Sequence, residues 1–404
     1  MGARRREAVY LAGALPVRLV TSGMGVALAL AAAEQLHDVA IGGVLIAVLN
    51  APSVVAASLI GALTDAVRSP KRLMLVASLV LAGGLALSAF LASVPLPLVL
   101  AALLLVGFTV PVFMGALSAW VEQAMPGDHA RGFAVDALSY NISGIAGPAL
   151  VAGMSALLSP TGALLALAAA SVVGGVLLQL LPITARGGSL HPRALAGGIA
   201  TATRFLVTHG PIARVALAGC LVLVGNGGMP VVAVLVARGH GLPSSAGGLL
   251  LTAFSIGGVA GALTGAVPAV TRRLARSPAP AVMGVCFALV GALTLLGAVL
   301  GAVTGSFVVT VIAIGLSGIA DAPGIAAMLR LRQQESPPEV RAQVFVVSAG
   351  LRAATAAIGA ALVSLGTGLD PTLLLVLVAL PWFSALPILL VGARRPVVGA
   401  VSRG

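Results

Sequence analysis

Long apolar stretches recur along the whole chain, and short polar connections separate them. Each stretch has about the 20 residues that a helix needs to cross a bilayer. Because backbone groups in lipid must satisfy their own hydrogen bonds, continuous apolar stretches of this length predict helices. The pattern predicts twelve membrane spans, at residues 10–33, 39–64, 73–94, 98–121, 133–158, 161–181, 212–236, 244–270, 279–300, 307–329, 344–365 and 372–391.

Composition agrees with this pattern. The chain has 404 residues, of which 59% are hydrophobic and only 8% are charged. Soluble domains carry roughly 25% charged residues. The sequence therefore predicts an all-α integral membrane protein.

The first apolar stretch follows three arginines, Arg4 to Arg6, which is also how a cleaved signal peptide begins. Arg18 interrupts the apolar part, however, and the stretch is long enough to span the bilayer. We expect it to remain in the protein as the first span.

The net charge of +12 is distributed unevenly over the connections. If the N-terminus is inside, all 23 Lys and Arg residues fall on the inner side except Arg18, Arg238 and Arg352. Cationic connections resist translocation, which gives cytoplasmic loops their positive excess. We therefore expect both termini in the cytoplasm. A role in nucleic-acid binding is excluded by the same placement of charge.

The longest internal connection divides the spans six and six. We expect an N-terminal bundle at 1–181, a cytoplasmic linker at 182–211 and a C-terminal bundle at 212–404. Residues 192–207 of the linker fit either a short surface helix or a flexible segment. The second and eighth spans end in GALTDAV (61–67) and GALTGAV (261–267), each before a basic loop, and Pro111 matches Pro323. These echoes predict a duplicated six-helix unit, hence two pseudo-symmetric six-helix bundles.

A basic motif follows the second span. The stretch GALTDAVRSPKR contains one glycine, one acid and three basic residues in a characteristic order: Gly61, Asp65, Arg68, Lys71 and Arg72. Charge-assisted contacts between the acid and the bases can hold the inner loop against the bundle in one state and release it in another. The alternative is a positive-inside anchor with an incidental carboxylate.

A second motif lies in the fifth span, where the sequence SGIAGPALVAG contains Ser143, Gly147 and Pro148. Proline lacks an amide donor, and small neighbours allow helices to bend and pack closely. Helix packing is the simplest interpretation of this motif.

With twelve spans, a six-and-six division and these two motifs, the chain resembles the major facilitator superfamily, nearest to its twelve-span exporters of drugs and small molecules. The match is partial, since the Arg after the acid of the first motif is replaced by Ala66 and its second glycine is missing. In that family spans one, four, seven and ten line a central cavity. The resemblance therefore implies cavity positions for Arg18, Phe113, Trp120, Asn226 and Asp321.

Three charges lie deep within spans: Arg18, Asp321 and Arg352. Such charges cost roughly 2.5–3.5 kcal/mol on insertion scales and mark functional sites by default. Each lies about eight residues from the inner end of its span, so we expect them to share one layer, with Asp321 close to Arg352. Two interpretations stay open: a static ion pair, or a pair that senses substrate or protons.

Other function classes fit the sequence less well. A nucleotide-driven pump would need a G-x-x-x-x-G-K-[ST] loop, which the chain lacks. The acidic residues are scattered without a D-x-x-D pair, which disfavours a membrane-embedded enzyme, and we expect no metal or cofactor. We expect a monomeric secondary transporter in the cytoplasmic membrane that exports a small molecule in exchange for protons. Uptake of a small metabolite is the alternative.

Overall fold

The computed structural model describes residues 3–125, 129–184, 192–264 and 276–390, and every regular element in these ranges is a helix. The first half contains α1 (Ala3–Gln35), α2 (Val39–Asn50), α3 (Ser53–Ala66), α4 (Pro70–Ser88), α5 (Leu96–Pro111), a π-helical turn (Val112–Ala116), α6 (Leu117–Ala119), α7 (Val121–Ala124), α8 (His129–Leu157) and α9 (Pro160–Leu178). After α10 (Pro192–Thr208), the second half contains α11 (Gly210–Gly227), α12 (Met229–Gly239), a 3₁₀ turn (Ser244–Gly247), α13 (Gly248–Thr264), α15 (Ala279–Thr304), α16 (Phe307–Glu335), α17 (Pro338–Leu365) and α18 (Pro371–Leu390).

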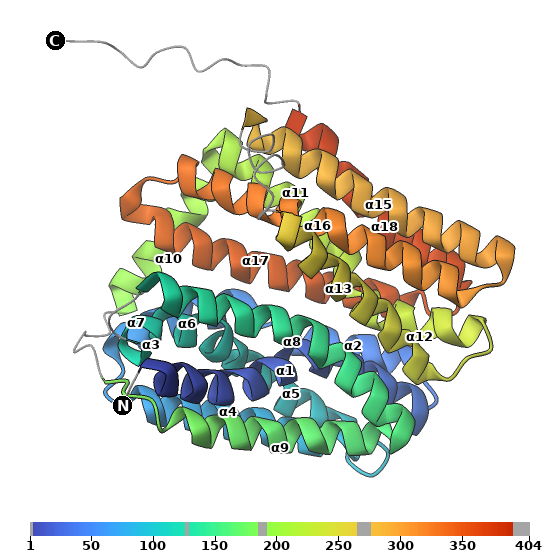
Figure 1. Ribbon diagram of the computed structural model, residues 1–404, viewed down its shortest axis with the longest axis horizontal. Helices are drawn as coiled ribbons and strands as arrows, with labels where there is room; N and C mark the ends of the chain where they lie inside the picture. Colours follow the sequence, from blue (N-terminus) through green and yellow to red (C-terminus); the bar gives the residue numbers. More distant parts are fainter. Residues whose placement is uncertain (1–2, 126–128, 185–191, 265–275, 391–404) are drawn as a thin grey trace.

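The helices form twelve membrane spans in two bundles of six. In the described part of the chain, eleven helical segments are long and apolar enough to cross a membrane. The remaining span is α8, whose 29 residues include Arg131 and Asp136 near its start. Figure 1 shows the first half on one side of the molecule and the second half on the other. Across the boundary, α17 contacts α2 and α3, and α13 contacts α8.

Three spans that the sequence predicts as continuous are interrupted. The second span breaks between α2 and α3 beside Pro52, and the seventh breaks between α11 and α12 just before Pro230. In the fourth span α5 ends at Pro111 and continues as the π-helical turn. A proline removes one backbone donor and clashes with the preceding turn, so each break lies where the hydrogen-bond ladder is already weakened.

The linker contains a helix, so the surface-helix interpretation of 192–207 is the correct one. Helix α10 contacts α11 and α17. Leu206 belongs to a small apolar cluster with Ile212 and Val344, and His209 lies 3.3 Å from Glu335 at the end of α16. The linker helix is therefore attached to the second half. The exact boundaries of the two bundles stay a prediction.

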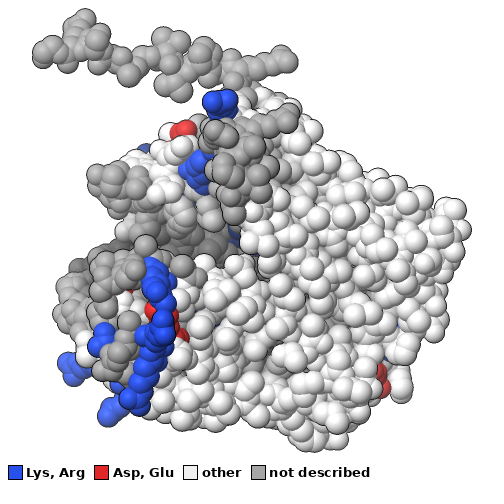
Figure 2. All heavy atoms as spheres, in the orientation of Figure 1, with Lys and Arg blue, Asp and Glu red and all other residues white. Residues whose placement is uncertain are grey.

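Basic side chains gather at one end of the molecule. Figure 2 shows Lys and Arg concentrated where the N-terminus lies in Figure 1, while most of this face carries no charge. Arg4, Arg68 and Arg72 are exposed, and Arg131 pairs with Glu7 at 2.6 Å. An uncharged surface between the two ends is what a surrounding bilayer requires. The structure thus separates a basic end from an opposite end, and the cytoplasmic position that the positive-inside rule predicts for the basic end stays a prediction.

Cysteine labelling tests this orientation. In a Cys220→Ala, Cys286→Ala background, we expect Ser159→Cys and Thr304→Cys to react with a membrane-impermeant maleimide on intact cells. Ser159 lies between α8 and α9, and Thr304 is the last residue of α15; both are at the end opposite the basic one. Thr208→Cys, at the exposed end of α10, is the matched control and should react only after permeabilisation. Labelling of Thr208→Cys on intact cells would reverse the orientation.

Candidate functional site

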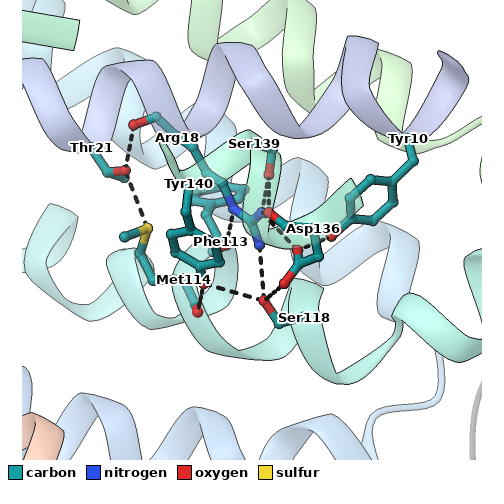
Figure 3. A network of polar contacts seen from close by, with 9 residues as sticks. All are labelled: Tyr10, Arg18, Thr21, Phe113, Met114, Ser118, Asp136, Ser139 and Tyr140. Carbon is teal, nitrogen blue, oxygen red and sulfur yellow. Dashed lines mark hydrogen bonds and ion pairs between the residues drawn. The ribbon is translucent and has the colours of Figure 1, made fainter. Parts of the chain in front are cut away.

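Arg18 lies midway along α1, and its side chain is completely buried. Its Nη1 atom lies 2.7 Å from Oδ1 of Asp136 on α8, which makes a buried ion pair. The same nitrogen donates to the backbone oxygen of Asp136 at 3.1 Å and to the hydroxyl of Ser139. Figure 3 shows these side chains converging from α1 and α8. The guanidinium is therefore fixed by two atoms of one acid and by a neighbouring hydroxyl.

The fourth span supplies further hydrogen-bond acceptors. Arg18 Nε donates to the backbone oxygen of Phe113 at 3.2 Å, and Nη2 donates to the Ser118 hydroxyl at 2.9 Å. The guanidinium also lies 3.8 Å from the centre of the Tyr140 ring, a cation–π contact. The Tyr140 hydroxyl donates to the backbone oxygen of Met114. Two backbone oxygens of the π-helical turn thus serve as acceptors, so the irregular turn after Pro111 takes part in the network.

The partners of Asp136 complete the network. Its Oδ1 accepts a hydrogen bond from Tyr10, and its Oδ2 accepts one from Ser118 at 2.8 Å. Buried charges are stable only when they are paired and their remaining donors and acceptors are satisfied. The network of Tyr10, Arg18, Ser118, Asp136 and Tyr140 meets both conditions and joins the first, fourth and fifth spans.

Asp136 is not among the site residues that the sequence predicts. It lies only a few residues inside the predicted fifth span, where a carboxylate looks like the end of a span, whereas the sequence places Asp321 as the one acid deep within a span. Arg18 was expected in one layer with Asp321 and Arg352, but its partner is in the first half. One signal was present: Asp136, Ser139 and Tyr140 are spaced i, i+3 and i+4, so they share one face of α8.

In the second half, Asp321 lies on α16 and Arg352 on α17. The two charges attract one another, but among the described ion pairs none joins them within 4.0 Å. The structure therefore does not contain the close pair that the sequence predicts. Asp321 is held less firmly than Asp136, because no direct ion pair fixes it.

A cavity of about 250 Å³ lies between the two halves. Ser22, Gly144 and Pro148 line it from the first half, and Asn226 and Ser255 line it from the second. Thr294 of α15 and mostly apolar side chains from α12, α13, α15, α16 and α18 cover the rest of its wall. A wall that is mostly apolar with a few polar groups is typical of small-molecule sites. Of the predicted cavity residues, Asn226 lies in this wall.

Phe113 and Trp120 do not line this cavity. Both are completely buried in the main apolar core, which extends over both halves. Phe113 contributes its backbone oxygen to the Arg18 network, whereas the indole nitrogen of Trp120 has no hydrogen-bond partner in the described part. Their side chains pack the fourth span against its neighbours.

The basic motif after the second span is described in part. Gly61 and Asp65 lie in α3, but their side chains are outside the described residues, so the charge contact predicted for Asp65 stays a prediction. Arg68 and Arg72 are exposed. Lys71 Nζ donates to the backbone oxygen of Gln179 at 2.8 Å, and Gln179 Nε2 donates back to the oxygen of Lys71 at 3.0 Å. Lys71 therefore joins the start of α4 to the end of α9.

The Gly-Pro motif of the fifth span forms a close helix contact. A Cβ atom on Gly147 would lie 2.9 Å from the backbone oxygen of Leu19, so α1 and α8 approach more closely there than a side chain allows. Ser143 is buried beside it, and Pro148 lies inside α8 without ending the helix. In the second half, a Cβ on Gly359 would lie 1.9 Å from Val224, where α17 crosses α11. A close helix contact at a glycine thus joins spans one and five in the first half and spans seven and eleven in the second half.

This contact predicts different effects for two glycines of α8. Gly147→Ala should lower the free energy of unfolding by about 1–3 kcal/mol, because the added carbon meets backbone atoms that cannot move aside. At Gly144 no atom lies within 4 Å of an added Cβ. Gly144→Ala should therefore leave stability unchanged or raise it by up to about 1 kcal/mol through helix propensity. Thermal unfolding of both variants in detergent makes the comparison, and equal midpoints would contradict the close contact.

A family model for the Major Facilitator Superfamily matches residues 10–362. A comparison with curated protein sequences finds no match. Among solved structures, the nucleoside transporter NupG has a TM-score of 0.78 at 14% identity, with 96% of this chain and 99% of that chain covered.

A peptide transporter POT in complex with alafosfalin has a TM-score of 0.74 at 16% identity, with 97% of this chain and 98% of that chain covered. At such identities the likeness to solved structures shows the fold alone. The family match extends over most of the chain, and the fold is that of transporters rather than of an enzyme. The chain belongs to the Major Facilitator Superfamily and is a multi-pass membrane transporter.

Proposed function

We propose that the protein moves a small molecule across the cytoplasmic membrane by alternating access, and that it exports this molecule in exchange for protons. The observation that carries the proposal is the cavity between the two halves, to which both bundles contribute polar groups, Ser22 from one and Asn226 from the other. A binding site at the boundary of two bundles can open to either side when the bundles rock against each other.

The halves are packed tightly at the end opposite the basic one, which supports a state closed to the outside. Arg238 Nη2, at the end of α12, donates to the backbone oxygen of Ala33 at 2.8 Å. A Cβ on Gly43 of α2 would lie 2.7 Å from the backbone oxygen of Ala360 on α17. Export requires these outer contacts to break and an inner set to form.

Coupling to protons needs an acid whose environment changes between states. Asp136 is unsuited, because Arg18, Tyr10 and Ser118 hold it on both oxygens. Asp321 is the better candidate, because Arg352 attracts it without a direct ion pair. The proton affinity of a buried carboxylate depends on the charges that face it. If the distance between Asp321 and Arg352 differs between states, proton binding is linked to conformation.

Transport by purified protein in liposomes tests the proposal. The liposomes contain the pH dye pyranine, a pH gradient of either sign is imposed, and amphipathic cations, organic anions, peptides and nucleosides are added in turn. We expect at least one compound to move protons in the direction opposite to its own movement. Empty liposomes are the control for passive leakage. Substrate movement that never changes the internal pH would contradict proton coupling.

Uptake is the alternative function, and the same assay separates it from export. The solved structures with this fold include a peptide transporter and a nucleoside transporter, although at 14–16% identity they do not assign a substrate here. In proton-driven uptake the substrate and the proton cross in the same direction. Acidification of the liposome interior during substrate entry would therefore favour uptake over exchange.

A further inference from the structure

A second group of buried charges lies where α11, α16 and α17 meet. Arg332 is near the end of α16 and is only 3% exposed, and Arg352 lies on α17. The two guanidinium groups are close enough to repel one another. Gly219 of α11 lies between them, since its added Cβ would be 3.6 Å from Arg332 Nη2 and 3.7 Å from Arg352 Cδ.

Both arginines carry unused donors. Nη2 of Arg332 and Nε of Arg352 are buried, and neither has a hydrogen-bond partner in the described part of the chain. A buried donor without a partner is destabilising, and more so when it belongs to a charged group. Arg18 is the contrast within the same protein, because its Nε, Nη1 and Nη2 atoms all donate to protein acceptors. Every guanidinium nitrogen of the first-half arginine has a partner, whereas the pair in the second half has nitrogens without one.

The charges of this group do not balance. Asp321 is the acid that interacts with Arg352, and it makes no ion pair with it within 4.0 Å. Among the side chains that the structure describes, two guanidinium groups and one carboxylate leave one positive charge without a counter-charge at a buried position. Buried charges in proteins are usually paired. An anion with oxygen acceptors would supply both the missing charge and partners for the unused donors.

Arg332 and Arg352 lie close to the central cavity along α11. Gly219 lies seven residues before Asn226 on α11, so the two are separated by ~10 Å at the rise of a helix. The arginine pair is displaced toward the start of α11, which is the basic end of the molecule. The arginine pair therefore lies on the basic side of the cavity.

We propose that Arg332 and Arg352 form a binding site for the anionic group of the transported molecule, a carboxylate or a phosphate. Guanidinium groups bind such oxyanions through two parallel N–H donors, which suits the free nitrogens of this pair. The inference rests on the proposed transport function and narrows its substrate to anionic compounds. Asp321 lies beside the site and opposes anion binding when it is charged.

Anion-dependent stability tests this site. Purified protein in phosphatidylcholine nanodiscs is titrated with inorganic phosphate or acetate at constant ionic strength set with chloride, and thermal unfolding is followed by tryptophan fluorescence. We expect phosphate to raise the unfolding midpoint of the natural protein. Arg332→Gln and Arg352→Gln should each weaken the apparent affinity about tenfold, because each removes charged donors. Arg204→Gln removes the same charge from the exposed face of α10 and should leave the affinity unchanged.

Weaker phosphate binding in an arginine variant could also come from misfolding, so a variant that is expected to bind phosphate more tightly is needed as well. Asp321→Asn keeps both arginines and removes the competing carboxylate, so phosphate should bind several-fold more tightly. An unchanged affinity in this variant would overturn the proposal, as would a natural protein whose midpoint ignores phosphate. If the unfolding midpoint rises only in nanodiscs that contain phosphatidylglycerol, the site binds a lipid headgroup. That result would overturn the proposal of a substrate site.

Failure of this inference can be distinguished from failure of the transport proposal. Arginine-dependent phosphate binding without any substrate flux in liposomes would contradict transport and leave the anion site intact. Substrate flux in a protein that binds neither phosphate nor acetate would contradict the anion site alone.

Discussion

Asp136→Asn is expected to lower the free energy of unfolding by about 3–5 kcal/mol, which is the usual cost of removing one partner from a buried ion pair. Arg18 would keep its charge but lose its counter-charge at a position with no access to water. The measurement is thermal unfolding of the purified protein in detergent, together with the fraction that remains monodisperse after membrane extraction.

Two further variants test whether burial of the ion pair causes the loss of stability expected for Asp136→Asn. Glu7→Gln breaks the ion pair with Arg131, whose side chain is 59% exposed, and should cost under about 1 kcal/mol. The double variant Arg18→Met, Asp136→Leu replaces both charges with apolar side chains and should recover most of the lost stability, because no buried charge is left unpaired. If Asp136→Asn is no less stable than Glu7→Gln, the network of Figure 3 does not hold the first bundle together.

Asp321→Asn is expected to abolish substrate accumulation driven by a pH gradient, while downhill exchange of substrate stays measurable. The side chain keeps its shape but can no longer bind and release a proton, so the link between protonation and conformation is lost. Both quantities are measured with the same preparation of proteoliposomes, first with an imposed pH gradient and then with a substrate gradient alone.

The matched control is Asp370→Asn, which removes the same charge outside the spans. Asp370 Oδ1 accepts hydrogen bonds from the backbone of Thr372 and Leu373 at the start of α18, and an asparagine can accept them too. This variant should retain coupled transport. Full coupled transport by the double variant Asp321→Asn, Arg352→Gln would contradict the coupling role and leave a structural one.

The membrane-spanning helices were readable from the sequence because the bilayer imposes a simple rule. A segment that crosses lipid must be apolar over about 20 residues and must satisfy its own backbone, so length and composition are enough to find it. The helix breaks at Pro52 and Pro230 were harder to predict from the sequence. A proline only kinks some helices and interrupts others, and the residues packed around it decide which occurs. Pro148 shows this, since α8 runs through it without a break.

The partners of the buried charges were decided only by the tertiary structure. Sequence placed Arg18, Asp321 and Arg352 at similar depths, and depth alone made one shared layer plausible. Which side chains meet depends also on which helices are neighbours and on how each is rotated about its axis. Close packing of α1 on α8 at Gly147 turns Arg18 toward Asp136, more than a hundred residues away in the chain.

The linker is a second case in which the sequence left a question open and tertiary contacts decided it. Residues 192–207 have no long apolar stretch, so the sequence left a helix and a flexible segment equally open. Most of the stability of such a short helix comes from the surface on which it packs. Helix α10 finds that surface on α11 and α17, with Leu206 against Val344. The sequence by itself determined the spans, the six-and-six division and the basic end, because these follow from local composition in a bilayer. The tertiary structure decided the charge partners, the cavity wall and the fold of the linker, because these depend on contacts between segments far apart in the chain.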